Sequence, residues 1–169
     1  MGSEGLIPFT VKRHSEITQL LAILDQAYNR PSWHGANLRG AIRRVSPAQA
    51  AWRPGPRRRN IWETVIHAAY WKYAASRRFV DLPQGSFHYK GSNWFRSPEM
   101  ASARAWKEDV ELLDRMHALL RGAVAKLSRR QLYATPTGKK VSNFAVLSGI
   151  AAHDLYHAGQ IQLLKRLWK

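Results

Sequence analysis

The spacing of apolar residues along the chain predicts helices separated by loops. Residues 15–28 place apolar side chains three or four positions apart, which is typical of one face of an amphipathic helix: Ile17, Leu20, Leu21, Leu24 and Tyr28. Pro31 and Gly35 interrupt this pattern, so a separate helical piece is expected over 37–45. Ser46 and Pro47 then have the types of a cap and a first helical residue, which predicts a further short turn.

A second long helix is predicted over 60–79. Asn60 and Glu63 have the spacing of a capping box at its start. Its sequence is apolar on most sides, so we expect it to be the central helix. A third helix is predicted to begin at Ser97 as cap with Pro98 in the first turn. The inner face of this third helix is regular: Trp106, Val110, Leu113, His117, Leu120, Val124 and Leu127.

A fourth helix is predicted from 142 to the end of the chain. The connections 81–96 and 128–141 are both too long for tight turns, and a short hairpin is possible near 133–140. We therefore expect an all-α protein, a four-helix bundle in one domain over 1–169. The long connections argue against a simple up-down-up-down order and indicate a crossover between the second and third long helices.

Two histidines on the predicted last helix are the first candidates for a functional site. His153 and His157 are four residues apart and therefore share a helix face. Apolar spacing turns that face inward, in a stripe that also contains Val146, Ile150, Ile161, Leu164 and Trp168. Buried imidazoles are costly without partners, and a metal ion would satisfy both. His67, two turns into the central helix, is placed to complete a three-nitrogen site with open positions.

Other residues leave alternatives open, because a core histidine is more often hydrogen-bonded than metal-bound. His117 is interpreted as such a core residue, with a fourth ligand as the alternative. His34 lies at the break after the first helix; it could reach the site, although a loop histidine usually does not. The sequence His-Asp-x-x-His at 153–157 is similar to the zinc-protease motif His-Glu-x-x-His. Aspartate is a shorter base than that glutamate, and no His, Asp or Glu follows His157 to serve as the third ligand that zinc proteases commonly take downstream. We expect Asp154 on the surface or beside a ligand.

The chain is strongly basic. It has 27 Lys plus Arg against 11 Asp plus Glu among 169 residues, a formal charge of +16, which predicts some affinity for polyanions at low salt. We interpret the charge as a solvated surface, with only non-specific binding of nucleic acid, because the basic groups are dispersed: 43–44, 57–59, 77–78, 129–130, 139–140 and 165–166.

Several kinds of protein are disfavoured by composition. With no cysteine, disulfides and thiolate sites are excluded, which leaves histidine and carboxylate as metal ligands. The longest uncharged apolar run, 141–152, is too short to span a bilayer, so no membrane partner is expected. Residues 1–13 lack the apolar core of a signal peptide, which predicts a cytoplasmic location.

Two longer motifs carry a family resemblance. They are Asn-Ile-Trp-Glu-Thr-Val-Ile-His-Ala-Ala-Tyr-Trp over 60–71 and Ala-His-Asp-Leu-Tyr-His-Ala-Gly-Gln-Ile over 152–161. Together with Trp-His-Gly at 33–35 and Ala-Trp-Arg-Pro at 51–54, they make the chain resemble proteins of the DinB-like superfamily. The resemblance covers most of the chain. The resemblance implies an up-down-down-up four-helix bundle, a metal triad at His67, His153 and His157 holding zinc or nickel, and often a homodimer.

The same resemblance implies a range of activities. Some relatives are transferases or isomerases that use a low-molecular-weight thiol such as bacillithiol or mycothiol. We therefore expect a metal-dependent thiol transferase or hydrolase acting on a small-molecule substrate. The arginines at 57–59, upstream of His67, are candidates to bind the anionic groups of such a thiol. The alternatives are a non-enzymatic, stress-linked bundle that binds metal or nucleic acid, and a bundle whose site is vestigial.

Overall fold

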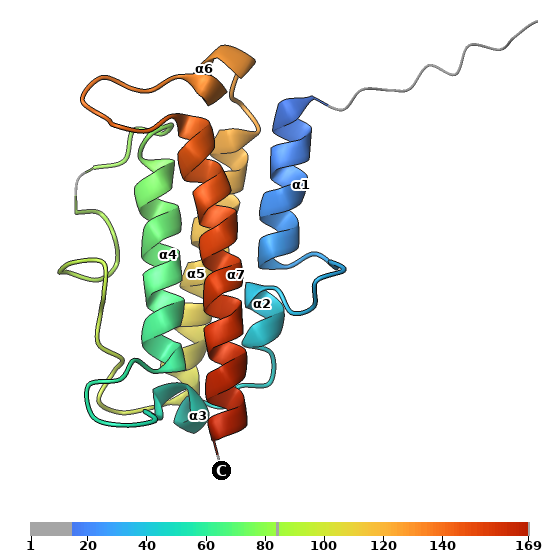
Figure 1. The fold of residues 1–169 in the computed structure, drawn as a ribbon. Helices are drawn as coiled ribbons and strands as arrows, with labels where there is room; N and C mark the ends of the chain where they lie inside the picture. Colours follow the sequence, from blue (N-terminus) through green and yellow to red (C-terminus); the bar gives the residue numbers. More distant parts are fainter. Residues whose placement is uncertain (1–14, 84, 169) are drawn as a thin grey trace, which may run out of the picture.

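The computed structural model describes residues 15–83 and 85–168, so the expectation about residues 1–13 lies outside the described chain. Four long helices form a bundle, and three short ones connect them (Figure 1). The long helices are α1 (Glu16–Tyr28), α4 (Ile61–Ser76), α5 (Ala103–Val124) and α7 (Asn143–Leu167); the short ones are α2 (Leu38–Ala41), α3 (Pro47–Ala51) and α6 (Arg129–Tyr133). The predicted all-α bundle is confirmed, and the described residues contain no strand.

Contacts between helix ends give the directions of the four long helices. Asp25, late in α1, binds Arg121, whereas Glu16, at the start of α1, binds Arg129 beyond the end of α5, so α1 and α5 are antiparallel. Arg78, just after α4, reaches Asn143 at the start of α7, so α4 and α7 are antiparallel as well. Helices α4 and α5 start at the same end of the bundle (Figure 1).

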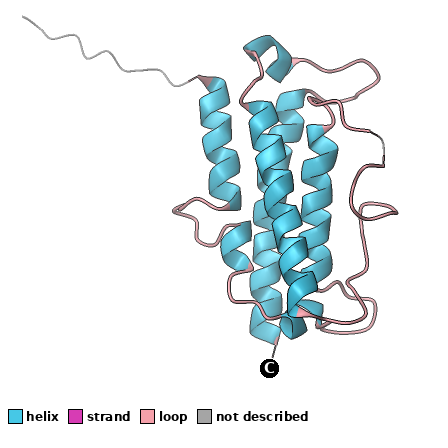
Figure 2. Ribbon diagram, turned by 180° about the vertical axis from the view of Figure 1, so that it is seen from behind, coloured by secondary structure: helices cyan, strands magenta, loops and turns pink. Residues whose placement is uncertain are grey.

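The segment 77–102 is the crossover that these directions require. Parallel neighbours cannot be joined by a tight turn, because the chain must return to the end where α4 began. The segment does so as a loop along the outside of the bundle, visible from behind in Figure 2. Near its end, the Ser97 hydroxyl accepts a 3.0 Å hydrogen bond from the side-chain amide of Asn60, the cap of α4. The crossover thus covers one side of α4.

Several predicted boundaries were wrong. The third long helix begins at Ala103 with Ser102 as its cap, not at Ser97, whose hydroxyl instead accepts the bond from Asn60. Helix α4 ends at Ser76 and not at 79. The piece expected over 37–45 is one turn, α2, and ends before Arg44, whose φ of 62° cannot continue a right-handed helix. Residues 133–140 form no hairpin; α6 and a turn occupy this connection.

The core forms around α4, as its apolar sequence predicts. Most of its residues are buried, and Trp62 donates a 2.6 Å hydrogen bond to Asp109 of α5, so even the polar atom of this indole has a partner.

The inward-facing stripe of residues predicted on α7 is only partly correct. Ile150, His157 and Ile161 are buried, whereas Trp168 is exposed and Val146 and Leu164 are half-buried. The buried face is rotated to include Asp154 instead.

Asp154 is the largest departure from expectation. It was predicted on the surface or beside a ligand, yet it is 1% exposed and binds the ammonium of Lys72, which is fully buried on α4. A charged residue tolerates such a position only when an opposite charge meets it there.

None of the helices in the described residues is long and apolar enough to cross a membrane.

Candidate metal centre

His67, His153 and His157 come together between α4 and α7. The antiparallel packing of these helices brings His153 Nε2 to 3.1 Å from His67 Nε2 and 3.0 Å from His157 Nε2. One ligand atom from each of the three rings lies within 4.8 Å of the others. Two nitrogens bound at about 2.0–2.1 Å to one ion are themselves roughly 3 Å apart, which matches the two separations from His153 Nε2. The group could hold a metal ion.

Hydrogen bonds on the far side of two rings fix which nitrogen carries the proton. His67 Nδ1 lies 2.6 Å from the carbonyl oxygen of Asn93, and His157 Nδ1 lies 2.7 Å from Gln160 Oε1. These oxygens only accept, so each Nδ1 donates and each Nε2 keeps its lone pair. Both lone pairs point toward His153 Nε2, which has at most one proton to share between them. A shared cation resolves this conflict, and the outer bonds are those that orient metal-binding histidines.

The rings are neutral at pH 7, as metal binding requires. Burial lowers the pKa of His67 to about 4, opposed by the Asn93 carbonyl and assisted by His157 and Arg59. Burial also lowers the pKa of His153 to about 3, with further lowering from the neighbouring rings. The pKa of His157 is lowered by burial as well, against the hydrogen bond to Gln160. Three neutral imidazoles are suited to zinc, nickel, iron or copper alike.

Aromatic side chains and one arginine surround the triad. The indole of Trp94 stacks on the His67 ring, with centroids 3.7 Å apart and an interplanar angle of 8°. The guanidinium of Arg59 lies 4.7 Å from the centre of the same indole. Trp71 presents an edge to both His67 and His153. An open coordination position would therefore adjoin an aromatic surface that carries one positive charge.

Three residues around the triad were not predicted from the sequence: Asn93, Trp94 and Gln160. Gln160 was detectable in principle, because a residue three positions after His157 lies on the neighbouring part of the same helix face. Nothing in the spacing of the crossover 77–102 identifies Asn93 or Trp94. They reach His67 only because this segment folds back along α4.

The other predicted candidates lie elsewhere. His117 is buried in the core, as interpreted from the sequence, but the hydrogen bond expected of it is not found among the described residues. Its ring stacks on Tyr28, and its Nε2 lies 3.4 Å from Asp25. His34 is exposed in the loop before α2 and is not part of the histidine group. Of the arginines at 57–59, Arg59 contacts the aromatic surroundings of the site.

The structure thus defines an all-helical bundle in which three imidazoles converge at a position that could hold a metal ion. The family model of the DinB superfamily matches residues 32–161, a span that includes all three histidines. The chain therefore belongs to the DinB superfamily. Comparison with curated proteins and with solved structures gives no match.

Proposed function

We propose that this protein binds one divalent metal ion, zinc or nickel, through His67, His153 and His157. One observation supports this most strongly: the Nε2 lone pairs of His67 and His157 converge on His153 while both Nδ1 atoms are held by oxygen acceptors. A hydrogen-bonded core cluster without metal would leave one of these lone pairs facing another nitrogen. Three protein ligands leave positions free for water or substrate, which is the pattern of catalytic sites.

We further propose that the site is that of a metal-dependent thiol transferase or hydrolase with a small-molecule substrate. A bound ion would stabilise thiolate or hydroxide at neutral pH and so supply a nucleophile to a chain without cysteine. In transfer, the thiolate sulfur forms a bond to an electrophilic carbon, the leaving group departs with its electron pair, and the thiol proton goes to water. In hydrolysis of an ester, hydroxide forms a bond to the carbonyl carbon, the carbon–oxygen bond to the alcohol breaks, and the departing alkoxide takes a proton from water. Trp94 and Trp71 would exclude water from one side of the reacting groups.

Arg59 is the residue proposed to attract the anionic groups of the thiol. Its neighbour Glu63, 3.6 Å away, is already bound in a two-point contact by Arg53, with N–O distances of 2.6 and 3.0 Å. The carboxylate charge is thus shared between two guanidinium groups, and a net positive charge remains beside Trp94. The Arg59 side chain is 52% exposed, so an incoming anion could reach it.

Metal content is the first test. Protein purified without a histidine tag should contain about one equivalent of zinc or nickel by elemental analysis, because a tag would bring its own ions. His67→Ala and His153→Ala should each lose the metal, while His34→Ala, which removes an exposed histidine, should keep it. Circular dichroism must show that the variants remain helical. Metal-free wild-type protein after exposure to both ions would reject the proposal.

Catalysis is tested separately on the metal-loaded protein. Turnover of a chloronitrobenzene with bacillithiol or mycothiol should release chloride and disappear in His153→Ala. Arg59→Gln should raise KM for the anionic thiol about fivefold with little change in kcat, since the guanidinium acts in binding. Arg58→Gln is the matched control and should leave KM unchanged. Metal binding without turnover of thiols or hydrolysable esters would favour the non-enzymatic alternative.

A further inference from the structure

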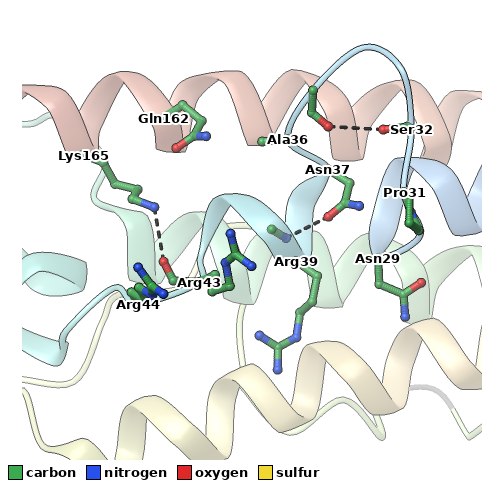
Figure 3. A pocket seen from close by; sticks show the side chains of 12 residues that line it. Asn29, Pro31, Ser32, Ala36, Asn37, Arg39, Arg43, Arg44, Gln162 and Lys165 are labelled. Atoms are coloured by element: carbon green, nitrogen blue, oxygen red, sulfur yellow. Dashed lines mark hydrogen bonds between the residues drawn. The ribbon is translucent and has the colours of Figure 1, made fainter.

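A cleft away from the histidine triad gathers positive charge that the proposed metal site does not use. Its volume is about 980 Å³, and it opens between α1, α2 and the second half of α7 (Figure 3). Its lining includes four cationic side chains and no carboxylate: Arg39, Arg43, Arg44 and Lys165, with Asn29, Asn37, Ser32 and Gln162 among its polar groups. The cleft is therefore basic and rich in hydrogen-bond donors.

The fold brings Arg43 and Arg44 to the same cleft as Lys165, which is far from them in sequence. Lys165, late in α7, donates hydrogen bonds to the carbonyl oxygens of Ala41 at 2.9 Å and Arg43 at 3.3 Å. Pairs 43–44 and 165–166 were interpreted from sequence as dispersed surface charge. In the structure, Arg43, Arg44 and Lys165 line one cleft. Arg43, Arg44 and Lys165 form no ion pair within the described residues, whereas Arg39 is neutralised by Asp114 at 2.9 Å.

Concentrating three unneutralised cations costs stability by mutual repulsion. Burial lowers the pKa of Lys165, and the positive charge of Arg43 lowers it further. Arg44 also holds a φ of 62°, a conformation unfavourable for a residue other than glycine. Both features are compensated if an anion occupies the cleft, and strained backbone of this kind is common where ligands bind.

We propose that this cleft binds the phosphate groups of a ligand that carries more than one of them. The chemistry fits either a free polyphosphate compound or the backbone of a single-stranded nucleic acid. Trp33 favours the nucleic acid: it lies between the lining residues Ser32 and Gly35, and its side chain is 96% exposed. An exposed indole beside a basic groove offers a stacking surface for an unpaired base.

The proposal is tested with two probes, a fluorescein-labelled 15-nucleotide oligothymidine and inorganic tripolyphosphate. Anisotropy follows the first and calorimetry the second. The variant Arg43→Gln/Arg44→Asn removes two charges and keeps a residue tolerant of positive φ at position 44. It keeps Lys165 and the two backbone carbonyl oxygens that this side chain binds, those of residues 41 and 43. Lys139→Gln/Lys140→Gln removes two adjacent, exposed charges between α6 and α7 that do not line the cleft, and serves as the matched control.

At 0.1 M salt, losing two phosphate contacts should weaken binding of the oligonucleotide about 20-fold and reduce the slope of log affinity against log salt by about 1.4. The control should change affinity less than about threefold. Trp33→Ala should weaken the oligonucleotide about tenfold and leave tripolyphosphate unaffected. Binding of tripolyphosphate alone, lost in the cleft variant, supports a small ligand. Binding of neither probe, or equal loss in both double variants, overturns the proposal.

Discussion

The buried pair between Lys72 and Asp154 gives a sharp prediction about stability. Lys72 is 0% exposed and Asp154 1%, so neither charge is solvated, and Asp154 Oδ1 has no hydrogen-bond partner among the residues that the structure describes. Burial lowers the pKa of Lys72 and raises that of Asp154, and each partner opposes the effect on the other. Asp154→Asn would leave an ammonium in the core facing a neutral amide and the ring of Tyr28 in place of a carboxylate. Breaking such a pair costs about 3–5 kcal/mol.

The matched variant removes both charges. In Lys72→Met/Asp154→Leu no charge remains to be desolvated, and replacing buried pairs by apolar residues is neutral or stabilising by about 1–4 kcal/mol. Guanidinium unfolding at pH 7, in chelator so that metal binding adds nothing, measures both variants. The double variant should be at least about 3 kcal/mol more stable than Asp154→Asn. If the single variant lies within about 1 kcal/mol of wild type, the pair is solvated and this reasoning is wrong.

Three further predictions concern acid stability, metal affinity and assembly. Burial lowers the pKa of His117 from 6.5 to about 4. Between pH 7 and pH 5 the unfolded chain therefore takes up a proton at this residue, the folded chain does not, and the free energy of unfolding falls. In urea unfolding, His117→Phe should lose about 2 kcal/mol less of this free energy over the interval than wild type does. Gln160→Leu removes the acceptor that orients His157 and should weaken zinc binding about 10–100-fold in competition with a chelator, while Gln160→Glu should restore it. A homodimer, implied by the family, should give about twice the 19.3 kDa chain mass by light scattering, and a single-chain mass would contradict it.

The three histidines were predictable because each lies on a continuous helix whose pattern is visible in sequence. His153 and His157 are one turn apart, and His67 lies in a segment too apolar to be anything but buried. Two regular helices packed side by side then leave few places where a third imidazole can meet the pair.

The errors have a common physical cause in contacts between distant segments. Ser97-Pro98 and Ser102 both have the residue types of a helix start, and the choice between them depends on Asn60, which binds the Ser97 hydroxyl. Asp154 was assigned to the surface or beside a ligand because it directly follows His153 and so points about 100° away from the histidine face of the helix. That direction is also buried, because Lys72 on another helix meets the carboxylate there. Likewise, the carbonyl of Asn93 reaches His67 through the path of the crossover, which periodicity does not describe.

The most direct test of the metal centre is a crystal of untagged protein, grown with zinc or nickel, and measured at the absorption edge of that metal. One anomalous peak is expected about 2.0–2.2 Å from the Nε2 atoms of His67, His153 and His157. A metal-replete crystal with no peak between these rings, or with a peak bound elsewhere, would contradict the account.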